Sequence, residues 1–204
     1  MKIAIDVDNT IYDTDRCSLE LYQAAAKELK LVIPKTREEV RKLGYKTDKR
    51  IQLLRCEPEL WFNSKYLITS ALEALKAYIQ EKDGVELYIL TARSKDLKFY
   101  EYMLKDDIKL FKGIIQKCDY AYKTDGCIAY DIDILVDDAQ KNLVNHILYT
   151  EGKVKGYKTK FIHYIGHSEE AQQKYIEGRE REQINVYTMK HWNEFKEIMQ
   201  RLEV

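Results

Sequence analysis

Residues 2–10 read Lys-Ile-Ala-Ile-Asp-Val-Asp-Asn-Thr, a short apolar run that meets two carboxylates and a threonine. The apolar residues of 2–5 favour a buried β-strand, and Asp6 is the first residue beyond that strand. Asp8 follows two residues later, where the chain leaves the strand. A polar cluster directly after a buried strand indicates a candidate functional site at the end of that strand.

Strand-like and helix-like segments alternate along the rest of the chain. Short runs of Val, Ile, Leu and Tyr mark strands, and apolar residues spaced three and four apart mark helices. This alternation predicts an α/β fold, a Rossmann-like parallel sheet with helices on both faces. The expected strands are 2–5, 85–90, 113–115, 132–136, 161–165 and 185–187. A first helix is expected from Leu19 onward, with Asp13 or Thr14 as its cap. Further helices are expected at 36–43, 67–79, 97–104 and 143–148, and around Trp192, Phe195, Met199 and Leu202. Residues 168–183 are expected to form a solvated helix or loop.

Composition narrows the class of protein. The 204 residues suit one domain or a domain with a modest insertion, and 45% hydrophobic with 33% charged residues indicates a globular chain. The formal net charge is zero, whereas proteins that hold duplex nucleic acid across a broad face usually carry a basic excess. We see no signal peptide, no apolar run of about 20 residues and no metal or disulfide spacing among four cysteines. These observations predict a cytoplasmic protein that has no membrane partner.

Four polar clusters fall where strands are expected to end. In an open α/β sheet, ligands bind at the carboxyl ends of the strands, so clusters far apart in sequence converge on one crevice. Phosphoryl transfer needs a nucleophile, a cation and donors for the phosphate oxygens, and crowded carboxylates favour Mg²⁺. The clusters are Asp6/Asp8/Thr10, Thr91/Arg93, Lys123 and Asp137/Asp138.

Each cluster also has a structural interpretation. Asp-x-Asp is common in loops, Asp-Asp after a strand often caps the next helix, and a single lysine in a polar loop carries little information. Arg93 at a helix start is either a phosphate or substrate contact or a surface charge. The order of all four clusters, each at a strand end, favours the catalytic interpretation.

These motifs resemble those of the haloacid dehalogenase-like hydrolase superfamily. Residues 3–10 resemble its first motif, 87–91 its second and 134–138 its fourth, while Lys123 stands for the basic third motif, with Lys117 as a rival. The resemblance implies a magnesium-dependent phosphatase, since an acid at position 8 is absent from the dehalogenases and phosphonatases. Asn9 stands where many members have Gly. The resemblance implies that Asp6 is the nucleophile and a magnesium ligand, and that Asp8 is the general acid/base and binds magnesium through its backbone carbonyl. It implies that Thr91 and Lys123 contact the phosphoryl group. Asp138, supported by Asp137, would complete the metal site.

The 80 residues between the first and second motifs resemble a small helical cap of this superfamily. We therefore expect a catalytic core at 1–12 and 84–204 and a cap at 13–83. Residues 57–62 resemble an aromatic segment of the cytosolic 5′(3′)-deoxyribonucleotidases, in which Trp61 and Phe62 either stack on a base or pack the cap core. Residues 67–71 lack the Pro-Gly turn of those relatives. The expected phosphate and substrate contacts are Thr10, Ala92, Arg93, Trp61 and Phe62.

The sequence thus predicts hydrolysis of a small phosphate monoester, with (deoxy)nucleoside monophosphates as the expected substrates. Another metabolite or a polynucleotide 3′-phosphate end is the alternative substrate. A non-catalytic phospho-ligand binding protein on the same fold is the alternative of another class. A signalling receiver domain would carry its acidic pair before the phosphoacceptor and would lack the insert. The oligomeric state, a dimer included, stays open.

Overall fold

The computed structural model describes residues 1–30, 34–36, 38–39, 58–93, 97–166 and 185–202. The predicted helix at 36–43 and the polar segment 168–183 lie wholly or mostly outside these ranges. The chain forms two compact units. The first comprises Met1–Ile11, Ile68–Lys95 and Lys109–Val204, and the second comprises Tyr12–Leu67 and Asp96–Ile108. Across the described ranges, every helix is too short or too polar to span a bilayer.

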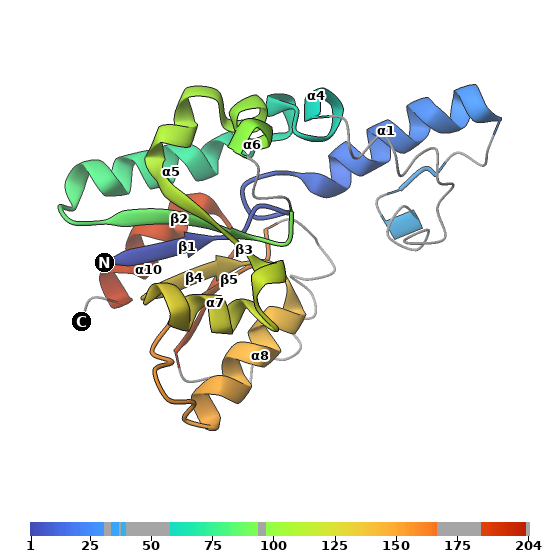
Figure 1. Ribbon diagram of the computed structural model, residues 1–204. Coiled ribbons are helices and arrows are strands. Elements are labelled where there is room, and N and C mark those ends of the chain that lie inside the picture. Colours follow the sequence, from blue (N-terminus) through green and yellow to red (C-terminus); the bar gives the residue numbers. More distant parts are fainter. Residues whose placement is uncertain (31–33, 37, 40–57, 94–96, 167–184, 203–204) are drawn as a thin grey trace. The chain divides into compact units, whose positions relative to one another are not determined.

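A six-stranded parallel sheet forms the centre of the first unit (Figure 1). Its strand order is β3-β2-β1-β4-β5-β6, the doubly wound order in which the chain changes direction between β1 and β4. The α/β Rossmann-like class predicted from the sequence is confirmed, and each predicted strand is present with its ends shifted by at most two residues. The strands are β1 Lys2–Ile5, β2 Glu86–Thr91, β3 Phe111–Gln116, β4 Ile134–Asp137, β5 Lys160–Tyr164 and β6 Val186–Met189.

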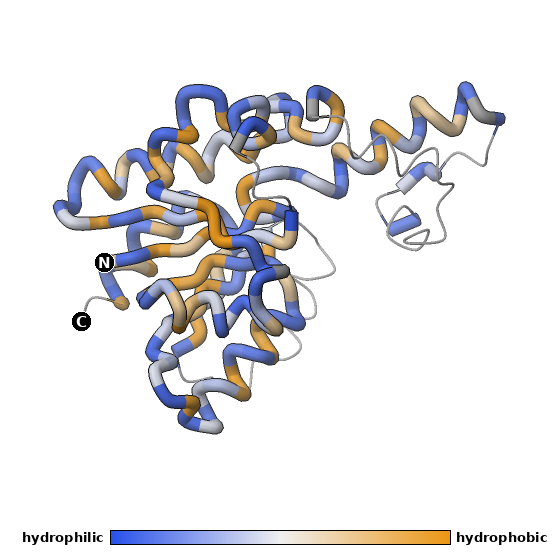
Figure 2. The backbone as a smooth tube through the Cα atoms, viewed as in Figure 1, coloured by the Kyte–Doolittle hydropathy of each residue, from blue (hydrophilic) through white to orange (hydrophobic). Residues whose placement is uncertain are grey.

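Apolar residues concentrate in the strands, as the hydropathy colouring in Figure 2 shows. The central strands read as nearly continuous apolar runs because both of their faces are covered. In β1, for example, Ile3, Ala4 and Ile5 are all fully buried although they alternate between the two faces. This burial holds the strand ends, and the polar residues on them, at one fixed edge.

Two pairs of helices pack against the sheet. Helix α5 (Thr69–Glu81) contacts α10 (Phe195–Leu202) and the 3-10 turn η5 (Trp192–Glu194), with Tyr78 and Phe195 in edge-to-face contact. Helix α7 (Lys123–Tyr130) contacts α8 (Gln140–Glu151). Cys127 of α7 and Leu143 of α8 belong to one buried apolar cluster with residues of the sheet. Right-handed connections in a doubly wound sheet change face where the strand order reverses, which separates α5, between β1 and β2, from α7 and α8, which follow β3 and β4.

The second unit is built from helix α1 (Thr14–Leu29), the short helix α4 (Pro58–Trp61), the turn η2 (Ser64–Tyr66) and helix α6 (Leu97–Leu104). Asp13, one of the two caps that the sequence predicted, accepts a hydrogen bond from the backbone N–H of Arg16 at 3.0 Å, and Thr14 is the first residue of the helix. The hydroxyl of Tyr12 donates to the Trp61 carbonyl at 2.8 Å, which ties the start of α1 to α4.

The observed division differs from the predicted cap at 13–83 in two places. Helix α5 lies in the first unit, where Leu75 and Tyr78 are buried and Tyr78 packs on Phe195. Helix α6 belongs to the second unit, although the sequence assigned it to the core. Its Phe99 and Tyr100 contact Phe62 of that unit, a long-range contact that helical periodicity alone does not specify.

Candidate active site

The register between β1 and β4 places two carboxylates side by side. Ile5 pairs with Val136, so Asp6 and Asp137 follow at the next position of each strand. The backbone N–H of Asp6 donates to the Val136 carbonyl at 2.9 Å and extends the ladder by one step. These strands flank the point where the strand order reverses, which is where open α/β sheets bind ligands.

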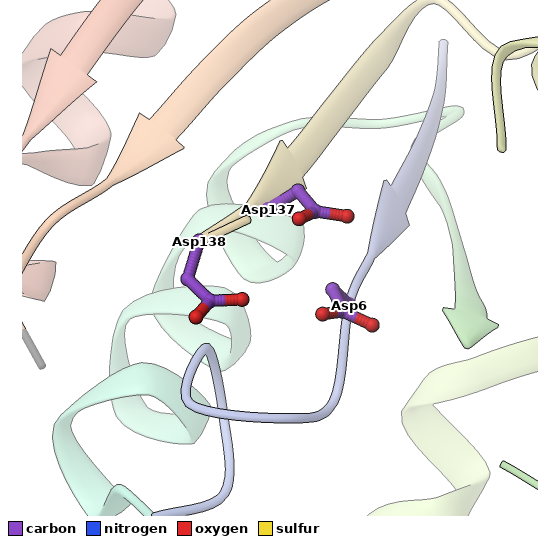
Figure 3. Close-up of side chains that lie close together, drawn as sticks. All are labelled: Asp6, Asp137 and Asp138. Atoms are coloured by element: carbon purple, nitrogen blue, oxygen red, sulfur yellow. The ribbon is translucent and has the colours of Figure 1, made fainter. Parts of the chain in front are cut away.

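Asp6, Asp137 and Asp138 form an acidic cluster at this edge (Figure 3). One carboxylate oxygen from each lies within 4.8 Å of the others. Asp6 and Asp137 are 5% and 0% exposed and Asp138 is partly exposed, so bulk water screens this cluster only weakly. Figure 3 shows Asp6 just past β1 and the other two at the end of β4.

Lys123 joins the two strands through an ammonium group placed between them. Its Nζ lies 2.6 Å from Oδ1 of Asp6 and 2.6 Å from Oδ2 of Asp137. The lysine is the first residue of α7 and is 5% exposed, whereas the sequence placed it in a polar loop. The structure thus brings Lys123 to the predicted strand ends through a helix start.

Asp137 is held by several donors at once. Its Oδ1 accepts from the Ala139 backbone N–H at 2.8 Å, and the Asn142 amide donates to both of its oxygens at 2.9–3.0 Å. With Lys123 added, the hydrogen bonds around this carboxylate fix its orientation. Asp137 therefore serves to hold the lysine, consistent with a supporting role in the predicted metal site.

A tight turn follows Asp6 and carries Asp8. Asn9 adopts a left-handed backbone with φ of 57°, a region that Asn tolerates well among non-glycine residues. The N–H groups of Thr10 and Ile11 both donate to the Val7 carbonyl at 3.2 Å. Thr10 is fully buried, and its hydroxyl lies 3.5 Å from the Asp8 carbonyl, a placement that suits support of the turn.

Thr91 and Arg93 come to the same edge from β2. Thr91 is the last residue of the strand, and its hydroxyl accepts the backbone N–H of Arg93 at 3.1 Å. The Arg93 guanidinium contacts Oδ1 of Asp8 through Nε at 2.9 Å and Nη2 at 2.6 Å. Ala92, between them, is exposed. The alternative of a surface charge for Arg93 is wrong, because its side chain is only 7% exposed.

The electrostatics reflect an excess of carboxylates. Burial, partly offset by Lys123, raises the pKa of Asp6 to about 7, and neighbouring Asp137 and Asp8 add to the rise. Burial and the charges of Asp6 and Asp137 raise the pKa of Asp138 well above its ordinary value. Burial alone would lower the pKa of Lys123, but Asp137 and Asp6 outweigh it and raise the pKa. Clustered carboxylates that resist ionisation are typical of functional sites.

The residues present fit a hard divalent cation. Four carboxylates, those of Asp6, Asp8, Asp137 and Asp138, are accompanied by Lys123 and Arg93, which leaves two excess negative charges when all are ionised. A buried excess of this kind is costly unless a cation compensates it. Oxygen donors of this type favour Mg²⁺ over softer metals.

Four contributors to this edge were not identified from the sequence: Asn142, Gln116, His163 and Trp192. Gln116 and His163 pair in register with Thr91 and Asp137, so matching the strand ends would have indicated both. His163 Nε2 lies 3.1 Å from the Asp138 carbonyl. The Trp192 indole donates to the Thr10 carbonyl at 3.0 Å across 182 residues, a contact that no local pattern indicates.

Trp61 and Phe62 lie in the second unit. Phe62 stacks on Phe99 with ring centroids 5.0 Å apart and meets Tyr100 edge to face. Trp61 and Phe62 are 9% and 4% exposed. The ring contacts of Phe62 are those of a core residue of this unit, which was one of its two predicted interpretations.

Comparisons with known proteins agree with the fold. No protein-family model and no curated protein matches the sequence. Among solved structures, a hydrolase of the haloacid dehalogenase superfamily, subfamily IA, from Geobacter sulfurreducens is similar with a TM-score of 0.59 at 15% identity, covering 97% of this chain and 98% of that one. A haloacid dehalogenase-like hydrolase from Streptococcus pneumoniae (TM-score 0.61, 14% identity) and a predicted phosphatase from Clostridium acetobutylicum (0.61, 12%) each match over 98% of both chains.

Proposed function

We propose that this protein is a phosphatase that hydrolyses phosphate monoesters through a phosphorylated Asp6, on the haloacid dehalogenase-like fold that it shares with those hydrolases. The observation that carries the proposal is the buried Asp6 carboxylate at the end of β1, paired with Lys123 and within 4.8 Å of the Asp137 and Asp138 oxygens. A carboxylate held in this way is a competent nucleophile toward phosphorus.

The first chemical step breaks the ester bond. An oxygen of Asp6 attacks phosphorus, and the bond from phosphorus to the ester oxygen breaks. Asp8 donates a proton to the departing oxygen, which leaves as an alcohol. Lys123 contacts the phosphoryl oxygens, and Thr91 can donate its hydroxyl hydrogen to them because its oxygen already accepts from Arg93.

The second step regenerates Asp6. The carboxylate of Asp8, having lost its proton, accepts one from a water molecule that attacks the phosphorus. The bond between phosphorus and the Asp6 oxygen breaks, and inorganic phosphate leaves. Lys123, held by Asp137, stays beside the carboxylate throughout and offsets its charge.

Mg²⁺ would be held by the Asp6 and Asp138 carboxylates and the Asp8 backbone carbonyl, and when bound it supplies positive charge that offsets the phosphate oxygens. Asp137 supports this set by orienting Lys123, and His163 does so through the Asp138 carbonyl. The two excess negative charges of the site support the choice of a dication.

A finer part of the proposal concerns the substrate, for which we favour (deoxy)nucleoside monophosphates. The support is the likeness of residues 57–62 to an aromatic segment of the deoxyribonucleotidases. If Trp61 stacks on a base, Trp61→Ala should raise KM for nucleotides by one to two decades and leave a small generic ester unchanged, since stacking contributes about 1–3 kcal/mol. Equal losses on both substrates would reject the base contact.

A phosphatase screen tests the proposal as a whole. It would cover nucleoside monophosphates, sugar phosphates and polynucleotide 3′-phosphate ends, each with Mg²⁺ and with chelator. We expect Mg²⁺-dependent release of phosphate from a small ester by the wild type and none from Asp6→Asn. Binding without turnover across the screen would favour the non-catalytic alternative instead.

A further inference from the structure

The Arg93 guanidinium contacts one oxygen of Asp8 through two of its nitrogens. Both Nε and Nη2 of Arg93 lie within 2.9 Å of Asp8 Oδ1. The arginine side chain is 7% exposed, whereas that of Asp8 is 33% exposed. The buried partner is therefore the cation, and the carboxylate extends from it toward solvent.

The position of Arg93 is itself fixed from two strands. Its backbone N–H donates to Thr91 Oγ1 at 3.1 Å, and its carbonyl accepts from the Gln116 amide at 2.7 Å. Gln116 ends β3 in register with Thr91 at the end of β2. Two adjacent strand ends thus hold the backbone that carries the guanidinium, which limits the entropy lost when it binds a carboxylate.

Asp8, in contrast, is carried by the turn after β1. Asp8 directly precedes Asn9, whose backbone is left-handed, and it lies between the end of β1 at Ile5 and the start of α1 at Thr14. A general acid must hold its proton within hydrogen-bond reach of the leaving oxygen, so its direction matters as much as its chemistry. Anchoring Oδ1 sets the direction of the other carboxylate oxygen.

We propose that Arg93 is a positioning residue for Asp8, which it orients for proton transfer to the leaving group, and that its main role is not to bind the phosphate. This inference rests on the proposed phosphatase function. Arg93 serves the bond-breaking step through Asp8, so its importance depends on how much the leaving group needs a proton. A phosphate clamp would matter equally for every ester, because the phosphoryl group is the same in all of them.

The test compares esters that differ in the leaving group. We would measure kcat/KM with Mg²⁺ for 4-nitrophenyl phosphate, phenyl phosphate and an alkyl phosphate, because this constant covers the steps up to loss of the leaving group. Nitrophenoxide leaves without a proton, whereas an alkoxide needs one. For Arg93→Met we expect a fall of about 10- to 100-fold on the alkyl ester and less than about 3-fold on the nitrophenyl ester.

Two further variants sharpen the result. Asp8→Asn should show the same dependence on leaving group, and adding Arg93→Met to it should cause almost no further loss, because the two residues act as one unit. Arg93→Lys keeps the charge without the fork and should fall between the wild type and Arg93→Met. Arg201→Met removes an exposed arginine that pairs with Glu197 and should change nothing.

Several outcomes would overturn the inference. Equal losses of kcat/KM on all three esters, in Arg93→Met or in the milder Arg93→Lys, would show that Arg93 is a phosphate contact or a purely structural residue. A lowered melting temperature would indicate the structural role, and an unchanged one the phosphate contact. Unchanged kinetics, or additive losses with Asp8→Asn, would equally reject it. If the wild type hydrolysed none of the esters, or if Asp6→Asn stayed active, the proposed function would fail together with this inference.

Discussion

The Nζ of Lys123 lies 2.6 Å from Oδ1 of Asp6, so the first residue of a helix neutralises the first residue beyond a strand. Both groups are about 5% exposed, and burial outweighs the lysine and raises the pKa of Asp6 to about 7, so the folded state disfavours the charged form of Asp6. This pair determines what each change in the site should do.

Asp6→Asn should abolish turnover and preserve the fold. The amide of Asn cannot form the acyl phosphate. The substitution also removes one negative charge beside Asp138 and so reduces the repulsion between the carboxylates. Phosphate release and far-UV circular dichroism would check this. Asp131→Asn is the matched control, since Asp131 is exposed and has a left-handed backbone that Asn accepts. Wild-type activity in Asp6→Asn would refute the mechanism.

The stability of the metal-free protein should depend on pH through Asp6. Its pKa is about 7 when folded and near 3.8 when unfolded, so the folded state binds the extra proton between those values. The contribution of Asp6 is fully present below about pH 4 and is lost as the pH rises through 7. The stability of the wild type relative to Asp6→Asn should therefore fall by on the order of 2–4 kcal/mol from pH 4 to 8. Urea titrations of both proteins in chelator would measure it, and a constant difference would contradict it.

Removal of divalent metal should abolish activity, and Mg²⁺ should restore it. Ca²⁺ should inhibit, because its looser and higher coordination lets Asp6 bind it through both oxygens and hinders attack. Mg²⁺ should also raise the melting temperature of the wild type but not that of Asp138→Asn, a readout independent of turnover. Full activity after exhaustive chelation would exclude this role for the acidic cluster.

His163→Phe should weaken Mg²⁺ binding by about 10- to 100-fold. The imidazole lies 3.1 Å from the Asp138 carbonyl, and residues that orient a metal ligand have effects of this size. The half-saturating Mg²⁺ concentration, from the thermal shift, would measure the loss. His163→Gln, whose amide can also donate, should recover part of it. Unchanged affinity in His163→Phe would show that the contact is incidental.

Phe62→Ala should destabilise the fold by about 3–5 kcal/mol, because a buried ring stacked on Phe99 is lost. Phe62→Leu keeps most of the volume and should cost less. Both should affect nucleotides and generic esters alike. A selective rise in KM for nucleotides, with an unchanged melting temperature, would instead place Phe62 at a base pocket.

Sequence patterns were sufficient for the strands and for the residues that follow them. A buried strand carries a continuous apolar run that ends abruptly at a polar residue, as at Asp6, Thr91 and Asp137, so strand and site were visible together. The helix start at Lys123 was missed, because α7 carries Thr124 and Gly126 and has little apolar periodicity. Its lysine is buried only because two carboxylates from other strands accept its charge.

Contacts that depend on register or on distant chain segments could not be predicted. Asn142 and Trp192 are ordinary helix and turn residues in the sequence, and their roles arise from what they face. The boundary between the units was also beyond local patterns. Helix α5 has the same amphipathic spacing whether it packs on a sheet or on a cap, and tertiary contacts decide between them.

The position of β1 in the middle of the sheet has a consequence for how the protein matures. Its residues pair on one side with β2 and on the other with β4, more than 130 residues further along the chain. The pairing of β1 with β4 closes a long loop, and contacts between residues far apart in sequence form slowly. Asp6 cannot meet Asp137 and Lys123 before that pairing. A refolding chain should thus recover its Mg²⁺ affinity only with the last, rate-limiting phase, and partly folded chains should carry no competent nucleophile.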